Sequence, residues 1–459
     1  MTPYPALTEL ADAYAAGTLT PAEVVDAHLE RIDRLDPQIG SFQTVYADEA
    51  RDAAKAATLA IRAGNRIGPF HGIPFGLKDI CELEGRITTG GSAAWTDRVS
   101  TMTGTVARRL IQAGGIVLGK TKTVECAYGG WGTNQRMGTP RNPWDMEQHR
   151  APGGSSSGSG AAVGAGLAVC AVGTDTGGSV RLPAAFCGIT GLKTTEGQIP
   201  TDGIIPLSHT LDTPGPMARS VADTLVMYEA MAGREPHLTD ADRHAGTGLF
   251  GLLRRGVAGL NLAILTEDER AACAADVLDA YDAACQRLAT LGARLTPFRM
   301  PTPYAKTTSE IGRLMSAEAW FHHQALYGDP AAPVDEDVRP RMLFGQTISA
   351  AEYLGLLAAR RAAQTEMART MDGVDAILTP TMTTTAPAID TLDQQTSPAH
   401  FTRTFNDLAM CGMAQPTGLS PDGLPTSLQI ACRGGDEAMA IRIAAALEAA
   451  GDPAPRPDL

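Results

Sequence analysis

The chain has 459 residues, of which 44% are hydrophobic and 19% are charged. This balance excludes an intrinsically disordered protein, which would carry more charge and bury less apolar surface. Asp and Glu number 51 against 38 Lys and Arg, so the formal net charge is −13; a chain of this sign is not expected to bind nucleic acid.

Residues 1–10 contain no basic segment followed by an apolar run of about 7–15 residues, so we expect no secretory signal and a cytoplasmic protein. The eight cysteines are scattered without a Cys-x-x-Cys pair, which predicts reduced, buried thiols. Residues 151–174 carry no charge, but their Pro, Gly and Ser content is too polar for a membrane span. We therefore expect no membrane partner.

The first half of the chain alternates between helical and strand patterns. Thr20 precedes Pro21 and Glu23, an N-cap arrangement that predicts a helix continuing to Ile32. Further segments follow in chain order, namely helix 49–63, a short apolar strand within residues 68–80, helix 106–113, strand 116–118, helix 161–167 and strand 169–172. Such alternation predicts an α/β sheet.

The second half begins with a mostly helical region from about 233 to 370. Its predicted elements are strand 260–265 and helices 272–291 and 350–371, followed by strands 376–378 and 427–430 and helix 437–450. The chain has neither an internal repeat nor a long linker. We therefore predict a single domain spanning residues 1–459.

Residues 114–121 spell G-x-x-x-x-G-K-T, the pattern of a nucleotide-binding phosphate loop. A phosphate loop needs a strand before its first glycine and a helix after its lysine. Here a predicted helix comes first, and residues 116–118 are themselves strand formers. The context therefore argues against nucleotide binding.

Residues 154–158 spell G-x-S-x-G, which would make Ser156 the nucleophile of an α/β-hydrolase. That motif needs a strand directly before it, whereas residues 145–152 are polar and end in Pro152. No histidine stands in a recognisable triad setting either. Ser156 is therefore the weaker candidate.

A second loop rich in glycine and serine, at residues 173–181, could support a different kind of reaction. Gly177 and Gly178 allow backbone turns in which consecutive N–H groups converge on an anion. Ser179 follows directly and could attack a carbonyl whose oxygen those amides hold. A tight turn is the alternative interpretation of such a loop.

Several long motifs occur together with this loop, and with them the chain resembles the amidase signature family. They lie at residues 72–79, 153–156, 173–184, 187–193, 211–220, 375–381 and 422–425. The resemblance covers most of the chain, with a core at residues 66–235 and a divergent region at 240–370 where substrate specificity would lie. It implies one α/β domain whose mixed central sheet is covered by helices on both faces.

The resemblance also implies a Ser-Ser-Lys triad. Ser179 would be the nucleophile, Ser155 the proton relay on a cis peptide, and Lys78 the base. Lysine accepts a proton only when it is neutral, and burial lowers its pKa from a reference of about 10.4 toward working pH. Apolar neighbours could supply a dry setting for this lysine, namely Phe70, Ile73, Phe75 and Leu77.

The oxyanion hole would use the backbone amides of Thr176, Gly177, Gly178 and Ser179. An ion pair between Asp175 and Arg181 could hold the loop, with an ordinary structural pair as the alternative interpretation, and Thr174 is also expected to have a structural role. These are the supporting residues that the resemblance implies.

The expected activity is hydrolysis of amide C–N bonds in a small-molecule substrate, with anilides, carbamates and aryl esters as further substrates. No metal and no cofactor is expected, since no His/Cys/Asp cluster has metal-ligand spacing. The sequence leaves the oligomeric state open, a homodimer included.

The alternative within the family is the glutaminase A subunit of a tRNA-dependent amidotransferase. That subunit usually carries Tyr-Gly where this chain has Glu196-Gly197. Residues 341–345 distantly resemble a glutamine-binding stretch of this glutaminase, although a surface helix explains them equally well. We therefore rank a stand-alone amidase first.

Overall fold

A mixed sheet runs through the computed structural model, which describes residues 4–234, 239–452 and 455–459. Its eleven described strands have the order β1-β3-β2-β4-β6-β5-β10-β11-β9-β7-β8. They are β1 (Phe42–Val45), β2 (Pro74–Lys78), β3 (Ile116–Thr121), β4 (Cys170–Asp175), β5 (Thr190–Lys193), β6 (Thr213–Ala218), β7 (Asn261–Leu265), β8 (Arg294–Phe298), β9 (Ala376–Pro380), β10 (Cys411–Leu419) and β11 (Pro425–Cys432). Residues 1–3 of the amino-terminal segment lie outside the described residues.

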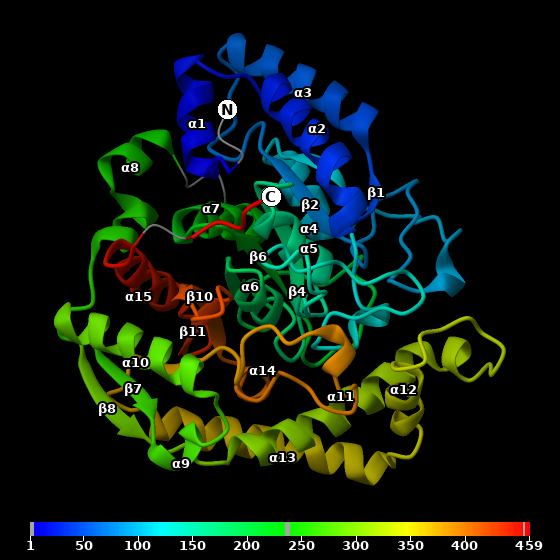
Figure 1. Cartoon of the computed structure of the whole chain (residues 1–459), viewed down its shortest axis with the longest axis vertical. Coiled ribbons are helices and arrows are strands. Elements are labelled where there is room, and N and C mark those ends of the chain that lie inside the picture. Colours follow the sequence, from blue (N-terminus) through cyan, green and yellow to red (C-terminus); the bar gives the residue numbers. More distant parts are fainter. Residues whose placement is uncertain (1–3, 235–238, 453–454) are drawn as a thin grey trace.

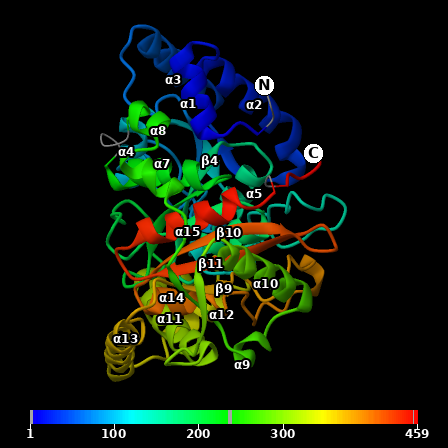
Figure 2. The ribbon, with the colours of Figure 1, turned by 90° about the vertical axis from the view of Figure 1, so that its left-hand side faces the viewer.

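The strands mix both directions. β2 pairs in parallel with β3 and β4, and β7 pairs in parallel with β8 and β9. The strands between these groups pair antiparallel, from β4 and β6 through β5, β10 and β11 to β9. Figure 2 shows β9, β10 and β11 crossing the middle of the molecule.

Helices surround this sheet (Figure 1). They are α1 (Leu7–Ala16), α2 (Pro21–Ile39), α3 (Ala47–Arg62), α4 (Thr105–Gln112), α5 (Ser157–Gly164), α6 (Arg181–Phe186), α7 (Val221–Ala232), α8 (Asp240–Ala245), α9 (Glu267–Arg270), α10 (Ala275–Thr290), α11 (Tyr304–Tyr327), α12 (Arg339–Gly345), α13 (Ala350–Thr370), α14 (Thr402–Asp407) and α15 (Glu437–Ala449). Helices α1–α3 lie at one end of the molecule, and α9, α11, α12 and α13 lie at the other (Figures 1 and 2).

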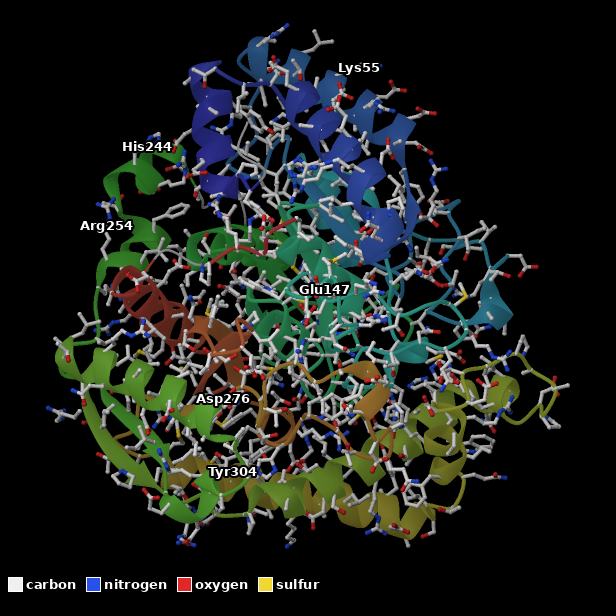
Figure 3. The ribbon with its side chains drawn as sticks, viewed as in Figure 1. Lys55, Glu147, His244, Arg254, Asp276 and Tyr304 are labelled. Atoms are coloured by element: carbon white, nitrogen blue, oxygen red, sulfur yellow. The ribbon has the colours of Figure 1, made fainter. Side chains whose placement is uncertain are left out.

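Both faces of the sheet are buried, as the alternation along β4 demonstrates. Cys170 and Val172 belong to the large apolar core that includes helix α7, whereas Ala171 packs in a separate cluster with Val163 of α5 and Ala184 of α6. Successive residues of a strand point to opposite faces, so helices cover both sides. Figure 3 shows side chains filling the space between the elements, with Lys55 on the outer surface of α3.

The predicted single-domain α/β fold is confirmed, and every predicted helix and strand is present with ends shifted by a few residues. The helix predicted to begin at residue 161 begins at Ser157. Five strands were not predicted, namely β1, β5, β6, β8 and β10. Of these, β8 extends the sheet inside the region predicted to be mostly helical.

Candidate active site

The site lies at the edge of the sheet where β2 and β4 end. Lys78 is the last residue of β2, and its neighbour Leu77 stands opposite Val172 of β4. Because these strands are parallel, their carboxyl ends meet at the same edge, where α/β sheets commonly place their functional groups. Lys78 therefore lies beside the carboxyl end of β4, where it contacts Thr174.

Lys78 is completely buried, as are its apolar neighbours Phe70, Ile73, Phe75 and Leu77. Its Nζ hydrogen-bonds to Ser155 Oγ at 2.8 Å and to Thr174 Oγ1 at 2.7 Å. Burial lowers the pKa of Lys78 to about 7, because the protonated amine loses its hydration. The neutral amine that a general base requires is therefore well populated near neutral pH.

Ser155 lies in the loop before α5, where the Gly154–Ser155 peptide bond is cis. Its carbonyl accepts hydrogen bonds from Thr123 Oγ1 at 3.0 Å and from Val124 N at 3.2 Å. The next residue, Ser156, donates its backbone N–H to the carbonyl of Ser179 at 3.3 Å. The two serine-containing loops are thus joined directly.

Ser179 lies in the short loop between β4 and α6 and lines a cavity of about 800 Å³. Its exposed fraction is 8%, whereas Ser155 and Lys78 are fully buried behind it. Within the described chain, the two hydroxyls of Ser155 and Ser179 do not hydrogen-bond to each other directly. Only Ser179 of these three residues lines the cavity.

The backbone amides of Thr176, Gly177 and Ser179 make no hydrogen bond within the described residues, and all three residues line the cavity. The structure differs from the predicted oxyanion hole at Gly178, whose N–H donates to Asp175 Oδ1 at 2.8 Å. A side chain could not replace this glycine, because its φ is +133° and a Cβ would lie 2.3 Å from Thr402 Oγ1. Gly178 therefore has a structural role, and three amides remain available to a developing oxyanion.

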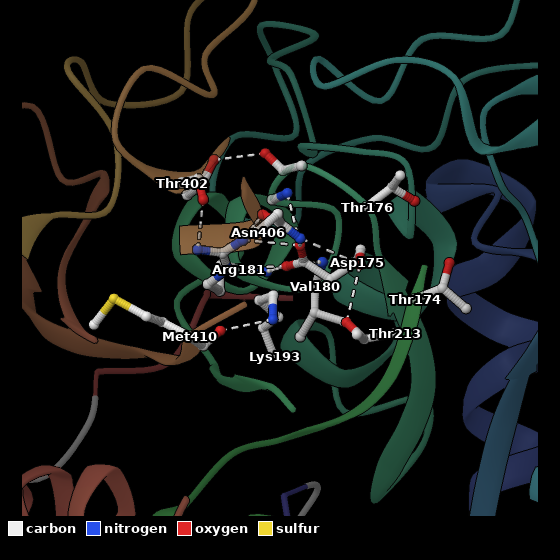
Figure 4. Close-up of polar contacts among 12 residues, drawn as sticks. Thr174, Asp175, Thr176, Val180, Arg181, Lys193, Thr213, Thr402, Asn406 and Met410 are labelled. Atoms are coloured by element: carbon white, nitrogen blue, oxygen red, sulfur yellow. Dashed lines mark hydrogen bonds and ion pairs between the residues drawn. The ribbon is translucent and has the colours of Figure 1, made fainter. Parts of the chain in front are cut away.

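A buried ion pair between Asp175 and Arg181 holds this loop (Figure 4). Burial alone would raise the pKa of Asp175, but the charge and hydrogen bonds of Arg181 hold it well below its usual range. The Arg181 guanidinium also donates to the carbonyl of Thr402 and to the side chains of Asn406 and Gln429. Every charge in the pair is thus compensated, as burial at this depth requires.

Sequence reasoning missed Asp212 as part of the site, although it falls inside the matched stretch 211–220. Its carboxylate accepts hydrogen bonds from Thr176 Oγ1, from Leu207 N and from Ser208 N. Burial raises the pKa of Asp212 to about 6, with these hydrogen bonds opposing the rise. Asp212 orients Thr176, one of the residues with a free amide.

The two rejected motifs have structural roles. Lys120, the lysine of the phosphate-loop spelling, lies in strand β3 and is buried against Asp79, with its Nζ also donating to the carbonyl of Cys81. Ser156 is buried and exchanges hydrogen bonds with the backbone of Thr174, donating to its carbonyl and accepting from its N–H. Neither residue lines the cavity.

The eight cysteines are free thiols, and all but Cys273 are buried. Among the described residues, no group of three or more His, Cys, Asp and Glu side chains is placed to hold a metal ion. In the same ranges, no helix combines the length and the apolar character needed to cross a membrane.

A buried lysine, two serines and a loop of free amides define a candidate site for acyl transfer. Comparison with known proteins agrees with this class. Residues 23–441 match the family described as Amidase. The chain belongs to the amidase family, whose members hydrolyse amide C–N bonds.

Individual relatives differ in their functions. The chain is 34% identical to 2-amino-5-chloromuconic acid deaminase of Comamonas testosteroni, over 94% of this chain and 93% of the relative. It is 33% identical to the A subunit of glutamyl-tRNA(Gln) amidotransferase from Gluconobacter oxydans, over 97% and 95%. The structure of peptide amidase from Stenotrophomonas maltophilia superposes with a TM-score of 0.84 at 27% identity, over 99% and 98% of the chains.

Proposed function

We propose that the chain is a stand-alone serine amidase that cleaves amide C–N bonds through an acyl-enzyme on Ser179. The observation that carries the proposal is the buried Lys78 amine, hydrogen-bonded to Ser155 at 2.8 Å and carrying a pKa of about 7. A lysine in this state can accept a proton that a serine hydroxyl must lose. Cytoplasmic localisation and the assignment of specificity to residues 240–370 belong to the same proposal.

In the first half-reaction, Ser179 Oγ attacks the substrate carbonyl while its proton passes to Ser155 and the Ser155 proton passes to Lys78. The amides of Thr176, Gly177 and Ser179 stabilise the oxyanion. The relay returns a proton to the leaving nitrogen as the C–N bond breaks. The link between the two serine hydroxyls forms once substrate is bound, because catalytic hydrogen bonds often tighten only then.

In the second half-reaction, water attacks the acyl-enzyme and the same relay accepts its proton. The ester bond to Ser179 breaks, the serine recovers its proton, and the carboxylic acid leaves. The net reaction consumes one amide and one water and yields one acid and one amine. This chain's own side chains supply every proton acceptor in the scheme.

The test is covalent labelling with a fluorophosphonate, followed by peptide mass spectrometry and assays on aliphatic amides, anilides and carbamates. We expect wild type to be labelled at Ser179, and Ser179→Ala to lose both labelling and turnover. Ser157→Ala is the matched control, because Ser157 is buried close by and its hydroxyl has no hydrogen-bond partner among the described residues. Labelling elsewhere, or an active Ser179→Ala protein, would remove Ser179 from the mechanism.

The second candidate is the glutaminase component of an amidotransferase, favoured by the 33% identity to the Gluconobacter oxydans protein over nearly the full length of both chains. Arg341, in the stretch that resembles a glutamine-binding segment, lies on α12 and lines the cavity. This candidate requires a second chain as its partner and a preference for glutamine. Co-purification with such a chain and selective glutaminase activity would support it over the stand-alone amidase.

A further inference from the structure

The cavity beside Ser179 differs in charge from the protein around it. Its lining includes three arginines, Arg313, Arg341 and Arg403, and no described Asp or Glu. The chain as a whole has a formal charge of −13. A positive cavity in an acidic protein is selective for anions, since opposite charge is attracted and like charge is repelled inside a low-dielectric cleft.

The three arginines are not equivalent. Arg313 forms an ion pair with Glu352, which neutralises its charge. Arg341 donates from Nη1 to the carbonyl of Tyr128 at 2.8 Å and from Nη2 to the carbonyl of Gln394. Its charge also acts on the carboxyl of Asp337, with which it forms no ion pair among the described residues. Arg403, at the start of α14, has no carboxylate partner among the described residues.

Arg403 is also the arginine nearest to the proposed chemistry. A Cβ built on Gly177 would lie 3.1 Å from Arg403 Cγ and 3.5 Å from its Nε, so the side chain lies directly over the loop of free amides. The Nε is buried without a hydrogen-bond partner in the described ranges, and Nη1 reaches only the carbonyl of Thr308 at 3.5 Å. A buried, unpaired guanidinium N–H is costly unless a ligand satisfies it.

The charges around Arg403 also favour a bound anion. Burial lowers its pKa, Tyr128 opposes this shift, and the like charge of Arg341 adds to it. Arginine nevertheless stays protonated in proteins, so two positive charges line the cavity, and Arg403 has no carboxylate partner among the described residues. An anion placed between them would relieve their repulsion and complete the hydrogen bonding of Arg403.

We propose that the substrate is an amide bearing a carboxylate a few atoms from its scissile carbonyl, such as the monoamide of a short dicarboxylic acid, and that Arg403, assisted by Arg341, binds this carboxylate. The inference rests on the proposed amidase function and specifies its substrate class. It also separates this substrate from glutamine, because the cavity lining contains no described carboxylate to pair with the ammonium group of an α-amino acid.

Three compounds of matched length test the inference on wild type. Glutaramate carries the carboxylate, pentanamide replaces it with a methyl group, and glutamine adds an α-ammonium group to glutaramate. We expect kcat/KM for glutaramate to exceed that for each of the other two by about 10-fold or more, the range of a charge-assisted hydrogen-bonded pair. Equal rates for glutaramate and pentanamide, or a preference for glutamine, would overturn the inference.

Substitutions of single arginines test which residue causes the preference for the carboxylate-bearing amide. Arg403→Met should lower the glutaramate-to-pentanamide ratio of kcat/KM by about 10- to 100-fold, and Arg403→Lys by less, because lysine keeps the charge but loses the planar fork. Arg313→Met is the matched control: its charge is already paired with Glu352, so the ratio should move by less than about 3-fold. An Arg403→Met protein that loses activity on both amides equally would assign Arg403 a structural role.

A binding measurement separates failure of this inference from failure of the proposed function. Glutarate has no amide to hydrolyse, so its stabilisation of wild type against thermal unfolding reports carboxylate binding alone. We expect glutarate to raise the Tm of wild type, and pentanamide at the same concentration to raise it less. Hydrolysis of pentanamide without a glutarate effect would overturn the inference and leave the amidase function standing, whereas stabilisation without any turnover would count against the function.

Discussion

Replacement of Lys78 by methionine should make the protein inactive and, at neutral pH, more stable. Methionine fills the volume of the lysine stem without an amine that must be held neutral in a buried site. The pKa of Lys78 is about 7 in the folded chain against 10.5 for a free side chain. Between these two values the unfolded chain binds a proton that the folded chain lacks, so wild-type stability rises with pH across this window.

The expected change in the free energy of unfolding follows from the size of this pKa shift. Each pKa unit corresponds to about 1.4 kcal/mol, so burying Lys78 costs roughly 4 kcal/mol at pH 7 and about 2 kcal/mol at pH 9. Removing the amine also leaves the hydroxyls of Ser155 and Thr174 without their lysine partner, which costs about 1–3 kcal/mol at either pH. Lys78→Met should therefore gain roughly 1–3 kcal/mol at pH 7 and little or nothing at pH 9.

The assay is equilibrium unfolding in urea, followed by circular dichroism at pH 7 and pH 9, with amide hydrolysis measured in parallel. The decisive quantity is the difference between variant and wild type, which should shrink by about 2 kcal/mol between the two pH values. Lys193→Met is the matched control for activity, because burial also lowers the pKa of Lys193, to about 8, while within the described ranges its Nζ donates hydrogen bonds only to the carbonyls of Thr194 and Met410. A difference that does not change with pH would refute the reasoning, as would an active Lys78→Met protein.

Three further predictions concern the same loops. Because only neutral Lys78 acts as base, kcat/KM should rise about 10-fold between pH 6 and pH 8 and then level off; initial rates across this range check it, and a flat profile contradicts the assignment. Asp175→Asn should lower the free energy of unfolding by about 3–5 kcal/mol in urea titrations, since it leaves Arg181 buried without its counter-charge; a loss below about 1 kcal/mol would contradict the role of the ion pair. Chelation with EDTA should leave hydrolysis unchanged, since the described residues hold no cluster fit for a metal, and inhibition reversed by one particular ion would show the reverse.

Strand β6 illustrates why sequence patterns missed part of the sheet. β6 (Thr213–Ala218) contains Pro214 and Pro216, which normally mark a loop. In the fold they pair with Thr174 and Val172 of β4, while the pairing of β6 with β5 is confined to its last two residues, Met217 and Ala218. Proline is therefore tolerated here because of where the neighbouring strands lie, which local pattern does not reveal.

The residue types of the candidate site were readable from sequence because the motifs are local. Lys78 ends an apolar strand, and Ser155 and Ser179 lie in glycine-rich loops whose spacing resembles that of one family. The buried pairing of Asp175 with Arg181 was likewise expected from residues six positions apart, and the structure has it. Local motifs of this kind identify the reactive residues of a loop, but they do not reveal which residues pack around it.

Tertiary structure alone decided which groups are free to act. The N–H of Gly178 donates to the side chain of Asp175, so that amide is already engaged, whereas those of Thr176, Gly177 and Ser179 are free within the described residues. Arg403 reaches Gly177 from more than two hundred residues away in the chain, and the cavity they line sets the charge that a substrate meets. Hydrogen-bond occupancy, desolvation of Lys78 and electrostatic potential all depend on contacts through space, so they arise only when segments distant in the sequence are packed together.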